Sequence, residues 1–182
     1  MTIRNQVSTN LLHHLMGPLG DPDVALAART DACILLMGLP DPARELAYRL
    51  HLSSGWRHGP FTVVDCAASD QGLENRVFDA LFASDTPPQP GVLQLRLAQA
   101  GTVLLQEINF LPLGTQRRLA RRLSELLPGP QPSRRRLIAS SSEPLFDRVM
   151  NGTFDDNLFY RLNVMQFTAT KVPRTAPPAP DQ

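Results

Sequence analysis

Residues 101–108 read Gly101-Thr102-Val103-Leu104-Leu105-Gln106-Glu107-Ile108, and this stretch decides the fold class. Its centre is apolar without alternation, which is typical of a strand buried on both faces. Similar apolar runs, bounded by Gly, Pro or Asp, occur at 33–37, 61–64, 137–139 and 164–167. They predict a mostly parallel, five-stranded sheet covered by helices.

Helical patterns lie between these runs. Residues 113–127 place Leu119, Leu123, Leu126 and Leu127 on one stripe, with four arginines largely off it, as in an amphipathic helix. Strands that alternate with helices imply right-handed crossovers and a three-layer α/β core. Arg117, Arg118, Arg121 and Arg122, with Arg134 to Arg136, leave two interpretations: a nucleic-acid surface, or a solvated helix face and a charged turn.

The composition favours the second interpretation. The chain has 182 residues, is 42% hydrophobic and 19% charged, and carries a formal net charge of +1, which is typical of one soluble globular domain without a field for nucleic acid or membranes. It has neither a membrane-length apolar run nor a signal-peptide core, so we expect a cytoplasmic protein. Cys33 and Cys66 lie in apolar runs, which predicts buried thiols.

Two longer patterns point to a family. Residues 101–108, followed by Leu111-Pro112-Leu113, Gln116 and Leu119, resemble the G-T-L-F-L-D-E-I, L-P-L, Q, L signature of the sigma-54 interaction (AAA+ ATPase) domain of bacterial enhancer-binding transcriptional activators. Leu158 to Val164 resembles that family's D-L-Y-Y-R-L-N-V. The resemblance implies a P-loop NTPase-like AAA+ core over residues 12–172, between an N-terminal segment, 1–11, and a flexible proline-rich tail, 173–182. We expect no helical lid and no DNA-binding domain in this length.

The nucleotide loop departs from the family pattern. Where the family has G-E-S-G-T-G-K-E, residues 38–45 read Gly38-Leu39-Pro40-Asp41-Pro42-Ala43-Arg44-Glu45. A P-loop binds phosphate through backbone N–H groups and a lysine, whereas two prolines lack that donor and Asp41 adds a negative charge. Gly38 and Arg44 therefore remain as a vestigial nucleotide loop. We expect no cofactor, with weak ATP binding through Arg44 as the alternative.

The hydrolytic residues depart as well. Gln106 stands where the family has the aspartate that helps to hold Mg²⁺, and a neutral amide is a poor ligand for that ion, although Glu107 is retained. The first of two arginine fingers is replaced by Asp155. Arg161 keeps the second, either as a finger or as a structural arginine paired with an acid such as Asp156. The polymerase-contacting G-A-F-T-G-A motif is absent between Phe78 and Gly91.

These departures predict a bacterial pseudo-ATPase. We expect a protein-binding regulator of sigma-54-dependent transcription whose partner is a sigma-54 activator or another AAA+ subunit, with an oligomer left open. The alternative is a weak ATPase module that contributes Arg161 as a finger in a mixed AAA+ ring. A third interpretation is a scaffold that now serves an unrelated interaction. The histidines His13, His14, His51 and His58 lack metal-ligand spacing, so no metal site is expected.

Overall fold

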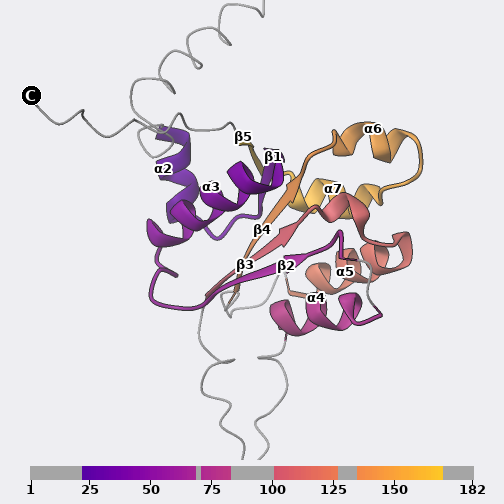
Figure 1. Cartoon of the computed structure of the whole chain (residues 1–182), viewed down its shortest axis with the longest axis horizontal. Helices are drawn as coiled ribbons and strands as arrows, with labels where there is room; N and C mark the ends of the chain where they lie inside the picture. Colours follow the sequence, from indigo (N-terminus) through magenta and orange to yellow (C-terminus); the bar gives the residue numbers. More distant parts are fainter. Residues whose placement is uncertain (1–21, 69–70, 83–100, 127–134, 170–182) are drawn as a thin grey trace, which may run out of the picture.

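The five predicted strands form one parallel sheet. A computed structural model describes residues 22–68, 71–82, 101–126 and 135–169 (Figure 1). The strands are β1 (Ile34–Gly38), β2 (Phe61–Asp65), β3 (Gly101–Gln106), β4 (Arg135–Ser141) and β5 (Met165–Ala169). Their order is β2-β3-β4-β1-β5, and all four pairings are parallel. The terminal segments 1–11 and 173–182 and most of the output-loop region lie outside the described residues.

Helices cover the sheet on both faces (Figure 1). They are α2 (Pro22–Arg29), α3 (Pro40–Leu52), α4 (Leu73–Phe82), α5 (Leu113–Leu126), α6 (Leu145–Met150) and α7 (Asp156–Leu162), with a 3₁₀ turn, η3 (Ile108–Phe110). Ile34 and Leu36 of β1 pack toward α2 and α3, whereas Leu35 belongs to the core under α4, α5 and α7. The predicted three-layer α/β core is confirmed, and the described elements include no helical lid.

The arginines of α5 contact α4. Arg118 pairs with Glu74, and its guanidinium lies 5.2 Å from the centre of the Phe78 ring. One turn later, Arg122 lies 5.5 Å from the Phe82 ring centre. Cation–π contacts of this kind are favourable, so the arginines of α5 lie over the aromatic side chains of α4. The arginine face is therefore solvated, as expected, but it also helps to hold two helices together.

The predicted charged turn at Arg135 and Arg136 is wrong, because both residues belong to β4 and are buried. Arg136 is 1% exposed. It donates hydrogen bonds to the carbonyl oxygens of Ala27 and, at 3.5 Å, Leu50, which lie in the last turns of α2 and α3. Its guanidinium stacks 5.4 Å from the centre of the Trp56 ring. A cation at the carboxyl end of two helices is favourable, so this arginine is part of the fold.

Candidate functional site

The connection from β1 to α3 is a single residue. The strand ends at Gly38 and the helix begins at Pro40, so Leu39 alone separates them. Gly38 has a φ of +146°, and a side chain at this position would collide with the carbonyl oxygen of Ala169 in β5. Proline suits the first position of a helix because its fixed φ is already helical. The local sequence therefore begins a helix where the family pattern has a glycine-rich loop.

The start of α3 offers few donors to an anion. A helix normally leaves its first backbone N–H groups free, and these bind phosphate in many proteins. Pro40 and Pro42 have no N–H, and the N–H of Ala43 donates to the carbonyl oxygen of Leu39 at 3.1 Å. Among the first three helical residues, Asp41 alone has a backbone N–H, and its own carboxylate lies in the same turn. This arrangement is poorly suited to a polyphosphate.

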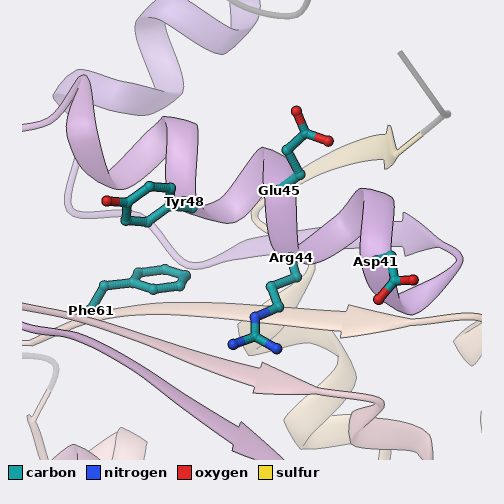
Figure 2. A pocket seen from close by; sticks show the side chains of 5 residues that line it. All are labelled: Asp41, Arg44, Glu45, Tyr48 and Phe61. Carbon is teal, nitrogen blue, oxygen red and sulfur yellow. The ribbon is translucent and has the colours of Figure 1, made fainter. Parts of the chain in front are cut away.

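Arg44 lies one turn further along α3, in a different environment from Gly38. It lines an open hollow of about 400 Å³ together with Asp41, Glu45, Tyr48 and Phe61 (Figure 2). Arg44 extends toward the sheet, whereas Glu45 points to the other side of α3 (Figure 2). Gly38 thus packs against β5, and Arg44 lies beside Phe61 of β2, at the opposite edge of the sheet.

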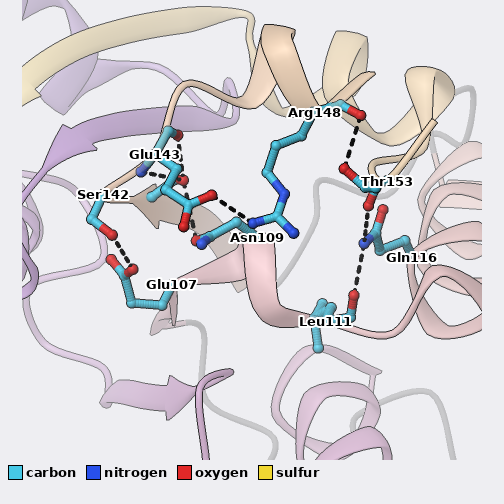
Figure 3. A network of polar contacts seen from close by, with 9 residues as sticks. Glu107, Asn109, Leu111, Gln116, Ser142, Glu143, Arg148 and Thr153 are labelled. Atoms are coloured by element: carbon cyan, nitrogen blue, oxygen red, sulfur yellow. Dashed lines mark hydrogen bonds and ion pairs between the residues drawn. The ribbon is translucent and has the colours of Figure 1, made fainter. Parts of the chain in front are cut away.

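Gln106 and Glu107 lie at the carboxyl end of β3, as predicted. Gln106 is half-buried and lies in register with Asp65 of β2. Glu107 adopts a left-handed backbone conformation, with φ 55° and ψ 51°, and is 5% exposed. Ser142 donates a 2.5 Å hydrogen bond to Glu107 Oε2 (Figure 3), and the Glu107 N–H lies 3.4 Å from Ser140 Oγ. Glu107 Oε1 is buried and has no hydrogen-bond partner among the described residues. The end of β4 and the residue after it therefore fix Glu107.

The serines at the end of β4 and directly after it were not predicted as site residues. Ser141 Oγ lies 3.1 Å from Asn109 Oδ1 and 2.6 Å from the carbonyl oxygen of Glu143, whose carboxylate pairs with Arg148 at 2.6 Å (Figure 3). The signal was present in the sequence, because three serines directly follow a buried strand run. Neighbouring parallel strands end at the same edge, so polar residues after β4 lie next to those after β3.

Asp155, at the first finger position, caps a helix. Its Oδ1 accepts a 2.9 Å hydrogen bond from the N–H of Leu158, which makes it the N-cap of α7. Its Oδ2 lies 3.8 Å from Arg117 Nε, and its own N–H donates to Gln116 Oε1 at 2.8 Å. Gln116 also donates to the carbonyl oxygen of Leu111 at 2.7 Å (Figure 3). Asp155 and Gln116 therefore position α7 on α5.

Arg161 lies in the last turn of α7 and is half-buried. The pairing with Asp156, one of the two alternatives for Arg161, is not formed, and Asp156 accepts a 2.8 Å hydrogen bond from the N–H of Asn157. Arg161 makes no ion pair with any residue whose position is described. Its charge lowers the pKa of Cys33, against the larger effect of burial, which raises it.

The remaining polar candidates are structural in the described part of the chain. Both cysteines are free thiols, and burial, with a smaller contribution from Asp65, raises the pKa of Cys66 to about 12. The His51 ring lies 3.0 Å from the Thr102 hydroxyl. Within residues 22–68, 71–82, 101–126 and 135–169, no three His, Cys, Asp or Glu side chains are grouped to bind a metal ion. None of the helices in these ranges is long and apolar enough to span a bilayer.

Comparison with known proteins gives consistent results. The family model for the sigma-54 interaction domain matches residues 22–168. The nitric oxide reductase transcription regulator NorR2 of Cupriavidus necator is 33% identical over 172 residues, which cover 88% of this chain and 31% of that protein. The regulatory protein AtoC of Escherichia coli is 36% identical over 155 residues, which cover 79% of this chain and 33% of that protein. The chain thus spans about a third of the length of these relatives.

Solved structures share the fold. The P-loop NTPase domain of the sigma-54 transport activator from E. coli superposes with a TM-score of 0.60 at 17% identity, covering 94% of this chain and 99% of that domain. NtrX from Brucella abortus in complex with ADP gives a TM-score of 0.62 at 24% identity, covering 92% of this chain and 42% of NtrX.

Proposed function

The chain belongs to the sigma-54 interaction domain family, and from this premise we propose that it is a non-catalytic AAA+ domain that regulates sigma-54-dependent transcription by binding another protein. The start of α3 is the observation that carries this proposal. Of the first three helical residues only Asp41 has a backbone N–H, and it also carries a carboxylate, where the family pattern requires a cradle of donors. Since backbone N–H groups provide most of the phosphate contacts in a P-loop, this start predicts that tight ATP binding is lost.

Independent features support the loss of hydrolysis. Gln106 offers a neutral amide where the family has the aspartate that helps to hold Mg²⁺. One oxygen of the Glu107 carboxylate already accepts a hydrogen bond from Ser142. Asp155 places a negative charge, already used as a helix cap, where the family has a cationic finger.

Calorimetric titration tests the nucleotide half of the proposal. ATP and ADP, each with and without Mg²⁺, are added to the purified chain, with NtrX from B. abortus as the positive control because it has been crystallised with both nucleotides. We expect no binding heat and no thermal shift at millimolar nucleotide. A dissociation constant below about 1 mM would contradict the proposal.

An exposed apolar surface supports the protein-binding half. Phe146 and Met150 of α6 and Tyr160 of α7 are 54%, 72% and 69% exposed. The buried ring of Phe159 joins them, 6.1 Å from Phe146 and 5.4 Å from Tyr160 between ring centres. Contiguous exposed apolar side chains often mark a protein interface.

Mixing the chain with a purified sigma-54 activator domain from the same cell tests this half. We expect a complex in size-exclusion chromatography with light scattering, weakened by Tyr160→Ser but not by Leu26→Ser, which changes an exposed leucine on α2. The absence of a complex at tens of micromolar, or equal weakening by both variants, would remove this part of the proposal.

Arg161 favours a second candidate function, that of a finger-donating subunit in a mixed AAA+ ring. Its guanidinium is partly exposed and unpaired within the described residues, so it is available to a phosphate bound by a neighbour. The test measures the ATPase rate of an intact activator as this chain is added. An increase that Arg161→Gln abolishes supports the mixed ring, and an unchanged rate removes it.

A further inference from the structure

The hollow beside β2 has an aromatic wall. The rings of Tyr48 and Phe61 meet edge to face at 63°, with centres 5.3 Å apart (Figure 2). His51 lies behind them, 5.4 Å from Phe61, and Thr102 holds it from β3 at 3.0 Å. Tyr48 is 48% exposed, so its ring is available to a ligand. The volume of about 400 Å³ falls in the range of small-molecule sites.

The charges of the hollow select one kind of ligand. Glu45 is paired with Arg49. Arg44 and Asp41, by contrast, form no ion pair among the described residues. Arg44 presents a planar fork of donors that matches a carboxylate. A polyphosphate would bring several negative charges against one guanidinium and the Asp41 carboxylate. A single negative charge on a flat apolar body matches both the arginine and the aromatic wall.

We propose that this hollow binds a small aromatic monocarboxylate, with its ring against Tyr48 and Phe61 and its carboxylate on Arg44. The site is separate from the Glu107 network and does not depend on the proposed function, because neither nucleotide nor partner protein contacts are needed to form it. It assigns Arg44 to a ligand other than ATP.

Titration by two-dimensional ¹H–¹⁵N NMR of the full chain tests the site with phenylacetate as the probe. We expect saturable shifts of α3 and β2 amides with a dissociation constant in the millimolar range. Acetate lacks the ring, benzyl alcohol lacks the charge and ATP has excess charge, so each should bind far more weakly.

Variants locate the interaction. Arg44→Gln should weaken phenylacetate binding about tenfold, since one charge-assisted contact is lost. Arg57→Gln, a matched change at an exposed arginine outside the hollow, should leave it unchanged. Amide dispersion reports whether each variant is folded, and Tyr48→Ala provides a second test of the aromatic wall. The proposal is overturned if phenylacetate gives no saturable shift, if acetate or ATP binds equally well, or if Arg44→Gln and Tyr48→Ala both bind as the unmodified chain does.

Discussion

Arg136 offers the sharpest test of how this fold is held together. The guanidinium is buried between the ends of two helices and a tryptophan ring. It donates hydrogen bonds to carbonyl oxygens of α2, which precedes β1 in the sequence, and of α3, which follows β1. Replacing it with methionine keeps much of the volume but leaves the Ala27 and Leu50 carbonyls without this donor.

The expected loss follows from those contacts. Losing a hydrogen bond at a buried polar group costs about 1–3 kcal/mol. The Ala27 carbonyl still accepts long hydrogen bonds from the N–H and hydroxyl of Thr30, both at 3.4 Å, and the 3.5 Å bond to Leu50 belongs near the lower end of the range. Loss of the contact with Trp56 adds about 0.5–1 kcal/mol. Burial also disfavours the cation, lowering the pKa of Arg136 to about 10, which offsets part of the loss. We therefore expect Arg136→Met to lower the free energy of unfolding by about 3 kcal/mol. Arg136→Lys should lose about half as much, because an ammonium cannot bridge both carbonyls and stack on the ring.

Urea unfolding provides the assay, followed by far-UV circular dichroism and by the fluorescence of Trp56, the chain's one tryptophan. Arg57→Gln is the control and should change stability by less than about 0.5 kcal/mol. The reasoning is refuted if Arg136→Met lies within that margin of the unmodified chain, or if lysine replaces arginine without loss.

Three further predictions concern other positions in the fold. Gly38→Ala should destabilise the fold by at least about 2 kcal/mol, through the φ of +146° and the clash with Ala169, whereas Gly55→Ala, which has no neighbour within 4 Å, should be tolerated in the same urea assay. Burial, and secondarily Arg136, lowers the pKa of His51, so the unfolded chain binds a proton at a higher pH than the folded chain does. The free energy of unfolding should therefore fall as the pH drops below 6.5, and His51→Gln should reduce that fall. The raised pKa of Cys66 works in the opposite direction, since the unfolded thiol ionises first: stability relative to Cys66→Ala should fall by about 1.4 kcal/mol per pH unit above pH 9.0, and equal pH profiles would contradict this.

The sheet could be predicted because burial leaves a direct mark on sequence. Each strand with two buried faces needs an unbroken apolar run, and β3 is buried from Gly101 to Leu105. The α5 helix was also predictable, since the leucine stripe was expected over residues 113–127 and the described helix covers Leu113–Leu126. These features depend on local patterns that tertiary contacts reinforce.

The errors arose where a tertiary contact overrides local character. Arg135 and Arg136 are charged and directly follow Arg134, so a turn was expected. Their backbone instead forms part of β4, and the ends of α2 and α3 accept hydrogen bonds from the guanidinium of Arg136. Ser142 and Asn109 have no motif of their own, and their role follows only from the alignment of β3 with β4. The alignment with the family pattern predicted Arg44 at the nucleotide loop, whereas the direction in which its side chain points depends on the residue at which α3 begins.

The start of α3 also explains why the departures from the family pattern belong together. Pro40 at the first helical position and Asp41 in the first turn both favour the helix, and Asp155 caps α7, an interaction typically worth about 1 kcal/mol. The substituted residues thus stabilise local structure at positions where the family pattern has phosphate-binding or charge-stabilising groups. The first turn of α3 lacks backbone donors because Pro40 and Pro42 have no N–H, so a substitution at Arg44 cannot restore them. The loss of ATP binding that we propose is therefore a property of the chain path between β1 and α3, and the charge at position 44 is free to serve a different ligand.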